Sequence, residues 1–163
     1  MKKTLIFPLV LLVALASCRK DDVSIIAPVV PVGTIAGTVD NIPFSFNSEC
    51  VADTFYHSYS GHILIIDGWE GEVANSNFIS FSISHPDGPF VPGLYTPSSF
   101  YYWEQSDSTS YIFSGSEPQP QVVVTAVTDS TVEGTFSGTV YNNYGVNFTS
   151  SHTINNGKFN VKF

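Results

Sequence analysis

Basic residues are scarce in this chain. The sequence has six Lys and Arg residues against fourteen Asp and Glu residues, a formal net charge of −8 at pH 7. From position 32 onward only Lys158 and Lys162 are basic. Nucleic-acid binding needs many cationic contacts to phosphates, and electrostatic docking on a bilayer needs a basic patch. The composition therefore excludes nucleic acid as a partner and gives no support to a basic membrane-docking surface.

Signatures of catalysis and metal binding are also missing. We find no nucleophile elbow, phosphate-cradling glycine loop or nucleotide fingerprint. A zinc site needs three or four converging ligands, and the four histidines lack such spacing; they are His57, His62, His85 and His152. We expect no cofactor, no metal and no enzymatic activity from these patterns.

No apolar run is long enough to span a bilayer. The longest, "TLIFPLVLLVAL", covers about a dozen residues behind Lys2 and Lys3 and contains Pro8. A spanning helix needs roughly 17–25 residues. A positive start, a short apolar stretch and small residues at its end describe a secretory signal peptide, here residues 1–17.

The junction after this leader carries two further patterns. Residues 15–18, "LASC", resemble the bacterial lipobox, which implies cleavage before Cys18 and lipid attached to its sulfur. Two or more acyl chains anchor a protein stably, so the expected partner of Cys18 is a lipid bilayer. Residues 19–22, "RKDD", resemble the charged export signal of surface lipoproteins of the Bacteroidota. This resemblance implies the outer membrane and the cell surface, with the periplasmic face as the alternative.

Two regions follow the leader. Residues 18–31 contain Pro28 and Pro31 within "VSIIAPVVPV", which favours an extended tether. Residues 32–163 form one domain of sufficient length for a core. If Cys18 is lipidated, Cys50 has no disulfide partner. Cys50 is then either a reactive nucleophile or a small residue packed in a strand, and no neighbouring charge favours an activated thiolate.

Strand signals recur from Gly33 to the end of the chain. Val, Ile, Phe, Tyr and Thr alternate with polar residues between frequent turn residues. We expect an all-β fold, a single antiparallel β-sandwich or flattened barrel of about ten short strands. The expected strands are residues 34–39, 42–47, 62–67, 77–84, 93–96, 99–105, 110–115, 121–127, 131–141, 151–154 and 158–163.

Three local patterns make this prediction specific. Asp40-Asn41 tolerates positive φ and predicts the first hairpin turn. Ile79, Phe81 and Ile83 share one face of a half-buried strand. Asn155-Asn156-Gly157 is the strongest turn signal in the sequence. It predicts a final hairpin in which Phe159, Val161 and Phe163 face inward, while Lys158, Asn160 and Lys162 face outward.

The domain also resembles a known group of proteins. The opening hairpin, "PGLYT", "VEGTFSGTV" and "INNGKFNVKF" are similar to small uncharacterised outer-membrane lipoproteins of the Bacteroidota that carry domains of unknown function. The resemblance spans most of residues 33–163. It implies the fold and the location, and it supplies no catalytic residues.

The acidic segment "DGWEGE" suggests two kinds of chemistry. Asp67, Glu70 and Glu72 could supply oxygen ligands to calcium, although the spaced pattern of a calcium loop is missing. A glycoside hydrolase needs an acid and a second carboxylate across the sugar, and Glu70, Glu72 or Glu104 could take these roles. The simplest interpretation is a solvated hairpin loop.

Aromatic residues give the best binding signal. In "FYYW", Phe100 and Tyr102 face one side of a strand, and Tyr101 and Trp103 face the other. An exposed pair can stack on sugar rings or hold a protein partner. We therefore expect Tyr101 and Trp103, with Trp69, to bind a ligand.

These patterns lead to one functional hypothesis. We expect a non-catalytic binding or accessory module for a glycan, a peptide or another envelope protein. The alternatives are a carboxylate-dependent hydrolase acting on a glycan and a purely structural envelope component.

Overall fold

The computed structural model describes residues 30–71, 76–106, 108–113, 118–142 and 150–163. This part of the chain contains strands and no helix, so the all-β prediction is confirmed, and it offers no helix that could cross a membrane. The strands are β1 (Thr34–Val39), β2 (Ile42–Phe46), β3 (Ser48–His57), β4 (Gly61–Trp69), β5 (Phe78–His85), β6 (Gly93–Tyr95), β7 (Ser99–Glu104), β8 (Thr109–Ile112), β9 (Gln121–Val127), β10 (Thr131–Asn142) and β11 (Ser151–Lys162).

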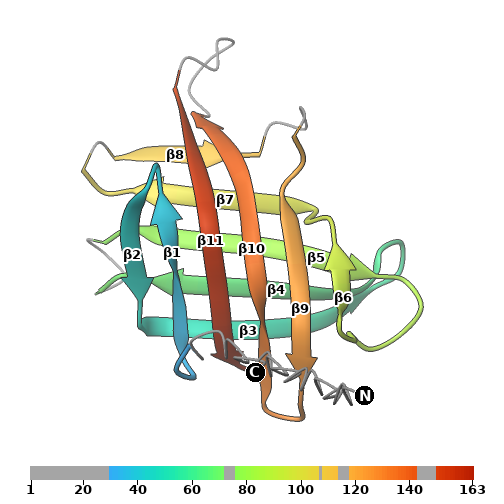
Figure 1. Ribbon diagram of the computed structural model, residues 1–163. Helices are drawn as coiled ribbons and strands as arrows, with labels where there is room; N and C mark the ends of the chain where they lie inside the picture. The colour runs from blue at the N-terminus through green and yellow to red at the C-terminus, as the bar shows by residue number, and fades with distance from the viewer. Residues whose placement is uncertain (1–29, 72–75, 107, 114–117, 143–149) are drawn as a thin grey trace, which may run out of the picture.

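The strands form one mixed sheet that folds into two layers. Its order is β2-β1-β11-β3-β4-β5-β7-β8-β10-β9-β6, with an additional pairing between β10 and β11. In Figure 1, β3, β4, β5, β7 and β8 lie in one layer, and β1, β11, β10 and β9 cross them in the other. The layers join where β10 pairs with β8 and where β11 pairs with β3. All of these pairings are antiparallel except β11–β3.

Four phenylalanine rings hold the layers together. Phe81 and Phe100 come from β5 and β7, and Phe136 and Phe159 from β10 and β11. The Phe81 centroid lies 5.8 Å from Phe100, 4.9 Å from Phe136 and 5.6 Å from Phe159. All four are buried. Burying a Phe side chain stabilises a fold by about 1.5–3 kcal/mol, so this cluster is a major source of cohesion between the layers.

Several local predictions are confirmed. Asp40 and Asn41 both have positive φ, at 50° and 69°, and turn the chain between β1 and β2. Ile79, Phe81 and Ile83 are fully buried on one face of β5. The β4–β5, β7–β8 and β9–β10 pairs form as expected.

The predicted turn at Asn155-Asn156-Gly157 is wrong. These residues lie inside β11, which runs without interruption between β1 and β10. Asn156 has a positive φ of 53°, and the pairing register of β11 shifts here with both β1 and β10. These residues therefore form a β-bulge and not a turn. A Cβ on Gly157 would lie 2.5 Å from the Phe136 carbonyl oxygen, which explains the glycine. Two flanking ladders of hydrogen bonds outweigh the local preference for a turn.

The prediction of which residues near the C-terminus face the core is correct in part. Phe159 and Val161 are buried as predicted, and Lys162 pairs with both Thr131 and Val51. Phe163 follows β11 and is 46% exposed, so it does not face the core. Asn160, predicted to face outward, is buried and donates its side-chain amide to the Val30 carbonyl oxygen at 3.0 Å. This bond fixes the start of the described chain to the end of β11.

Cys50 lies in β3, a strand that the sequence patterns did not predict. Its side chain is buried, and burial raises the pKa of the thiol, although backbone groups of Ile35 and Trp69 partly oppose this shift. Gly68 makes room for it, because a Cβ there would approach the Cys50 sulfur to 2.9 Å. Cys50 is thus a packed core residue, as the sequence indicated.

Candidate functional site

Four aromatic residues lie close together on the outer face of the β4–β5–β7 layer. The register places Trp69 opposite Phe78, and Phe78 opposite Trp103. The Trp69 and Phe78 ring centroids are 4.2 Å apart, and Tyr101 lies 5.9 Å from Phe78. All are half-buried, whereas the alternate residues Phe100 and Tyr102 are in the core. We call Trp69, Phe78, Tyr101 and Trp103 the aromatic row.

The aromatic row brings together all three residues expected to bind a ligand. Trp69 and Trp103 are distant in sequence, and the β5 residue Phe78 connects them. Phe78 was not identified from the sequence. Its position on the serine-bearing face of β5 follows from the alternation with Ile79, Phe81 and Ile83, so the signal was present.

A polar row lies directly beyond the aromatic row. Glu70, Asn77 and Glu104 each adjoin an aromatic-row residue in sequence. The Asn77 side-chain amide donates to Glu70 Oε2 at 2.6 Å, and the Gln105 amide donates to Asn77 Oδ1 at 2.9 Å. The Trp103 indole N–H donates to Gln105 Oε1 at 3.4 Å. These bonds connect Glu70 and Asn77 to Gln105 and Trp103, whereas Glu104 contacts His152.

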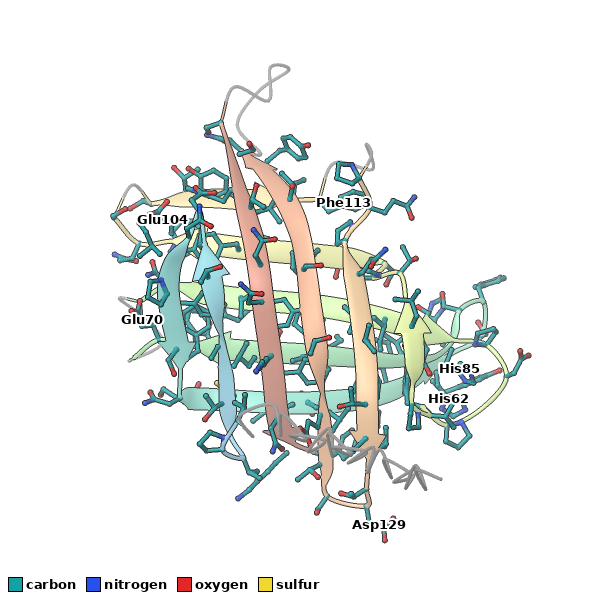
Figure 2. All side chains as sticks on the ribbon, viewed as in Figure 1. His62, Glu70, His85, Glu104, Phe113 and Asp129 are labelled. Carbon is teal, nitrogen blue, oxygen red and sulfur yellow. The ribbon has the colours of Figure 1, made fainter. Side chains whose placement is uncertain are left out.

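Two cavities meet at the polar row. The rim cavity, about 490 Å³, is lined by Glu70, Gly71, Ser76, Asn77, Gln105 and Ser106. The mouth cavity, about 200 Å³, lies between the β1–β2 hairpin and β7 and is lined by Asp40, Phe44, Glu70, Asn77, Tyr102, Glu104 and His152, among others. Both contain Glu70 and Asn77. Figure 2 shows Glu70 and Glu104 on the same side of the molecule, beside β2.

An imidazole links two carboxylates from different parts of the fold at the mouth cavity. His152 Nδ1 donates to Asp40 Oδ2 at 2.6 Å, and the Thr153 amide donates to Asp40 Oδ1 at 2.8 Å. Glu104 Oε2 lies 3.0 Å from His152 Nε2. Nε2 has no hydrogen-bond partner among the described residues, and its contact with Glu104 is an ion pair only when the His152 ring is protonated. We call Asp40, Glu104 and His152 the polar clamp.

The environment of the polar clamp favours the ionised form of Asp40. Burial opposes ionisation, but the Thr153 amide and the His152 ring outweigh it, so the pKa of Asp40 is below its ordinary value. The His152 ring packs against Tyr111, with centroids 4.2 Å apart, and against the edge of Tyr102 at 5.8 Å. The clamp therefore joins the β1–β2 turn, β7 and β11 through one side chain.

Asp67 lies beside the aromatic row on the outer face of β4, in the strand predicted over residues 62–67. That strand continues to Trp69, so the first half of the segment interpreted as a loop is strand. Burial raises its pKa, a hydrogen bond with Ser80 opposes this shift, and the charge of Asp53 adds to it. Its Oδ1 atom is buried without a hydrogen-bond partner among the described residues. The fold therefore disfavours ionised Asp67.

The three calcium candidates are not brought together. Asp67 contacts Ser80 on the outer face, Glu70 lines the two cavities, and Glu72 lies outside the described residues. Within the described ranges, no three His, Cys, Asp or Glu side chains are grouped to hold a metal ion. Glu70 and Glu104, the described candidates for hydrolysis, do share the mouth cavity.

Comparisons with known proteins found no relative of this chain. No protein-family model, no curated protein and no solved structure matches this chain.

Asp40, Asn77 and His152 were not identified as site residues from the sequence. Asp40 was assigned to a turn, and His152 was considered only as one of four histidines that lack the spacing of a zinc site. Asp40 and His152 are 112 residues apart in sequence, and the pairing of β1 with β11 brings them together. No local pattern carries that information.

Proposed function

We propose that this protein binds a saccharide chain without cleaving it, along the aromatic row and into the two cavities at the rim. The observation that carries the proposal is the register of Trp69, Phe78 and Trp103 beside Glu70, Asn77 and Glu104. Planar rings provide apolar contact with the faces of sugar rings. Carboxylates and amides accept and donate hydrogen bonds to hydroxyl groups. Along β7, Trp103 lies on the outer face and Glu104 lies on the inner face with Tyr102, so a saccharide would contact both kinds of group only where it passes over the rim.

The proposed anchor is a lipid on Cys18, which holds the domain at the outer membrane and on the cell surface. Its support is the lipobox-like sequence and the charged segment that follows it. Mass spectrometry of the protein purified from membranes should find acyl chains on Cys18. Protease treatment of intact cells should then remove the domain. Recovery of the protein with an unmodified Cys18 thiol would contradict the anchor.

The chain offers a direct test of saccharide binding. It contains two Trp residues, and both belong to the aromatic row, so intrinsic fluorescence reports on the site. We expect cellohexaose, laminarihexaose or mannohexaose to change this fluorescence in a saturable manner. Trp103→Ala and Trp69→Ala should each weaken binding by about tenfold or more, as for central aromatic contacts.

A matched pair of variants separates the row from general surface effects. Tyr59→Ala removes a fully solvated aromatic residue, 95% exposed, and should leave binding unchanged. Equal losses in Tyr59→Ala and Trp103→Ala, or no response to any of the three hexasaccharides, would overturn the proposal.

The second candidate function is glycan hydrolysis, favoured by the presence of Glu70 and Glu104 at one cavity. A hydrolase of this kind needs both carboxylates. Glu104→Gln and Glu70→Gln should then abolish release of reducing ends, while Trp103→Ala mainly weakens binding. Under the binding proposal, no reducing ends are released and the Gln variants still bind.

A further inference from the structure

The second half of β3 is open to solvent on both faces and along one edge. From Asp53 to His57 every residue is exposed, although a strand in a layered fold normally buries alternate residues. Four of the ten exposed large hydrophobic residues lie in this strand and the turn after it: Val51, Phe55, Tyr56 and Tyr59. This concentration distinguishes the strand from the rest of the described surface.

The backbone of this half-strand has one paired side. β4 pairs with β3 from Val51 to His57. On the other side, β11 pairs only at Val51, opposite Lys162. Within the described ranges, no strand continues this pairing along residues 52–57. Unpaired N–H and C=O groups on an exposed edge accept an additional strand.

A cavity lies next to this edge, between the layers. It measures about 370 Å³ and is lined by Thr54, His62, Phe90, Val127, Asp129 and Phe163, among others. Figure 2 places His62 and Asp129 away from the edge that carries Glu70 and Glu104, so this cavity is separate from the saccharide site. We call residues 52–57 and this cavity the open corner.

We propose that the open corner binds an extended peptide of a partner protein, which adds a strand to the edge of β3. Strand addition takes its affinity from main-chain hydrogen bonds and its specificity from pockets for alternate side chains. This site is independent of the saccharide proposal.

The residues around the edge define the chemistry of the peptide. Alternate side chains of the added strand would enter the cavity beside Phe90, Val127 and Phe163, which requires bulky apolar groups. The other side chains would lie on the outer face, where Asp53 stands between the exposed Val51 and Phe55. The carboxylate favours Lys or Arg, whose aliphatic stem can pack on the two apolar side chains. The partner segment therefore alternates apolar and basic residues. A second copy of this chain fits poorly, because its own net charge of −8 is repelled.

The test uses a fluorescein-labelled, capped decapeptide of alternating Val and Lys residues. A peptide of the same composition with all Val residues before all Lys residues is the control for charge alone. We expect the alternating peptide to bind at least about tenfold more tightly, as measured by fluorescence anisotropy. Hydrogen exchange of the complex should show added protection of amides in residues 52–57 and no change in β8.

Matched variants place the peptide. Thr54→Arg puts a bulky cation at the cavity and should weaken binding by about tenfold. Thr135→Arg makes the same change at an exposed threonine of β10 and should leave binding unchanged. Phe163→Ala, outside β11, is a second variant that should also weaken binding if Thr54→Arg fails to fold.

Three outcomes overturn the proposal. Equal affinity for both peptides, or equal effects of Thr54→Arg and Thr135→Arg, would mean that only net charge is recognised. A dimer in analytical ultracentrifugation that protects residues 52–57 without peptide would assign the edge to a second copy. Each outcome leaves the saccharide proposal unaffected, because Trp fluorescence tests that site separately.

Discussion

The two places where the layers join are built in opposite ways. Near β8, two residue pairs connect β8 to β10, and the polar clamp ties the β1–β2 turn, β7 and β11 together. At the open corner, a single pair, Val51 with Lys162, connects β3 to β11, and apolar side chains remain exposed. The layers are therefore joined by a cluster of polar side chains at one corner and by a single residue pair at the other. Each corner presents a different chemistry to a ligand.

The largest effect should come from β11, which serves both corners. Deleting residues 158–163 removes Phe159 and Val161 from the core and the pairing with β1, β3 and β10. We expect loss of cooperative unfolding in circular dichroism and calorimetry. Deleting Phe163 alone should leave a cooperative transition, since this exposed residue lies beyond the strand. A truncated chain that melts like the full chain would refute the role of β11.

The next largest effect is the difference in stability between a substitution at the polar clamp and one at the open corner. His152→Ala leaves Asp40 and Glu104 without their imidazole partner and removes ring contacts with Tyr102 and Tyr111, so the free energy of unfolding should fall by about 1–3 kcal/mol. Thr54→Ala, at the open corner, should change it by less than about 0.5 kcal/mol. Urea unfolding measures both. Equal effects would show that the corners do not differ in stability.

Two carboxylates should respond to pH with opposite signs. The pKa of Asp40 is lowered in the fold, so its stabilisation is present above the ordinary carboxyl pKa and is lost as pH falls through the folded-state pKa. The pKa of Asp67 is raised, so ionising it costs stability as pH rises through the folded-state pKa.

The matched substitutions reveal this difference. At about pH 7, Asp40→Asn should destabilise the protein and Asp67→Asn should not, and both differences from the parent should shrink toward about pH 2. Urea unfolding as a function of pH provides the measurement. The same sign for both variants at neutral pH would contradict the assigned environments.

The smallest effect concerns the rate of local opening at β3. Cys50 is buried beside the Val51–Lys162 pair, and burial raises its thiol pKa, so a thiol reagent should modify it only when the strand opens. In a Cys18→Ser chain, Cys50 should react much more slowly than an exposed thiol introduced by Ser58→Cys in a Cys50→Ala background. Similar rates would mean that β3 is already open at Cys50.

The sequence predicts the parts of this fold that depend on neighbouring residues. Asp40-Asn41 marks a hairpin, and the alternation from Phe78 to Ser84 marks a half-buried strand. It does not predict β3. Residues 53–57 are all exposed, so their sequence shows no alternation of apolar and polar side chains that would mark a strand. The misread turn at Asn156 has a related cause, since pairing on both sides of β11 decides its structure.

The candidate site also contains residues that the sequence predicts and residues that it does not. Tyr101 and Trp103 were recognisable, because the alternation within one strand assigns their face. The polar clamp was not, because Asp40 and His152 meet only through long-range pairing. The alignment of Trp69 with Trp103 likewise depends on the register of β5 between them.

The bond between Asn160 and Val30 fixes where the chain arrives at the domain. Val30 to Gly33 precede β1 beside the end of β11, and Asp40 follows β1 at its far end. A strand of this length extends roughly 20 Å. With acyl chains on Cys18, the tether would reach the domain at the start of β1, and the mouth cavity would lie about one strand length from that attachment point.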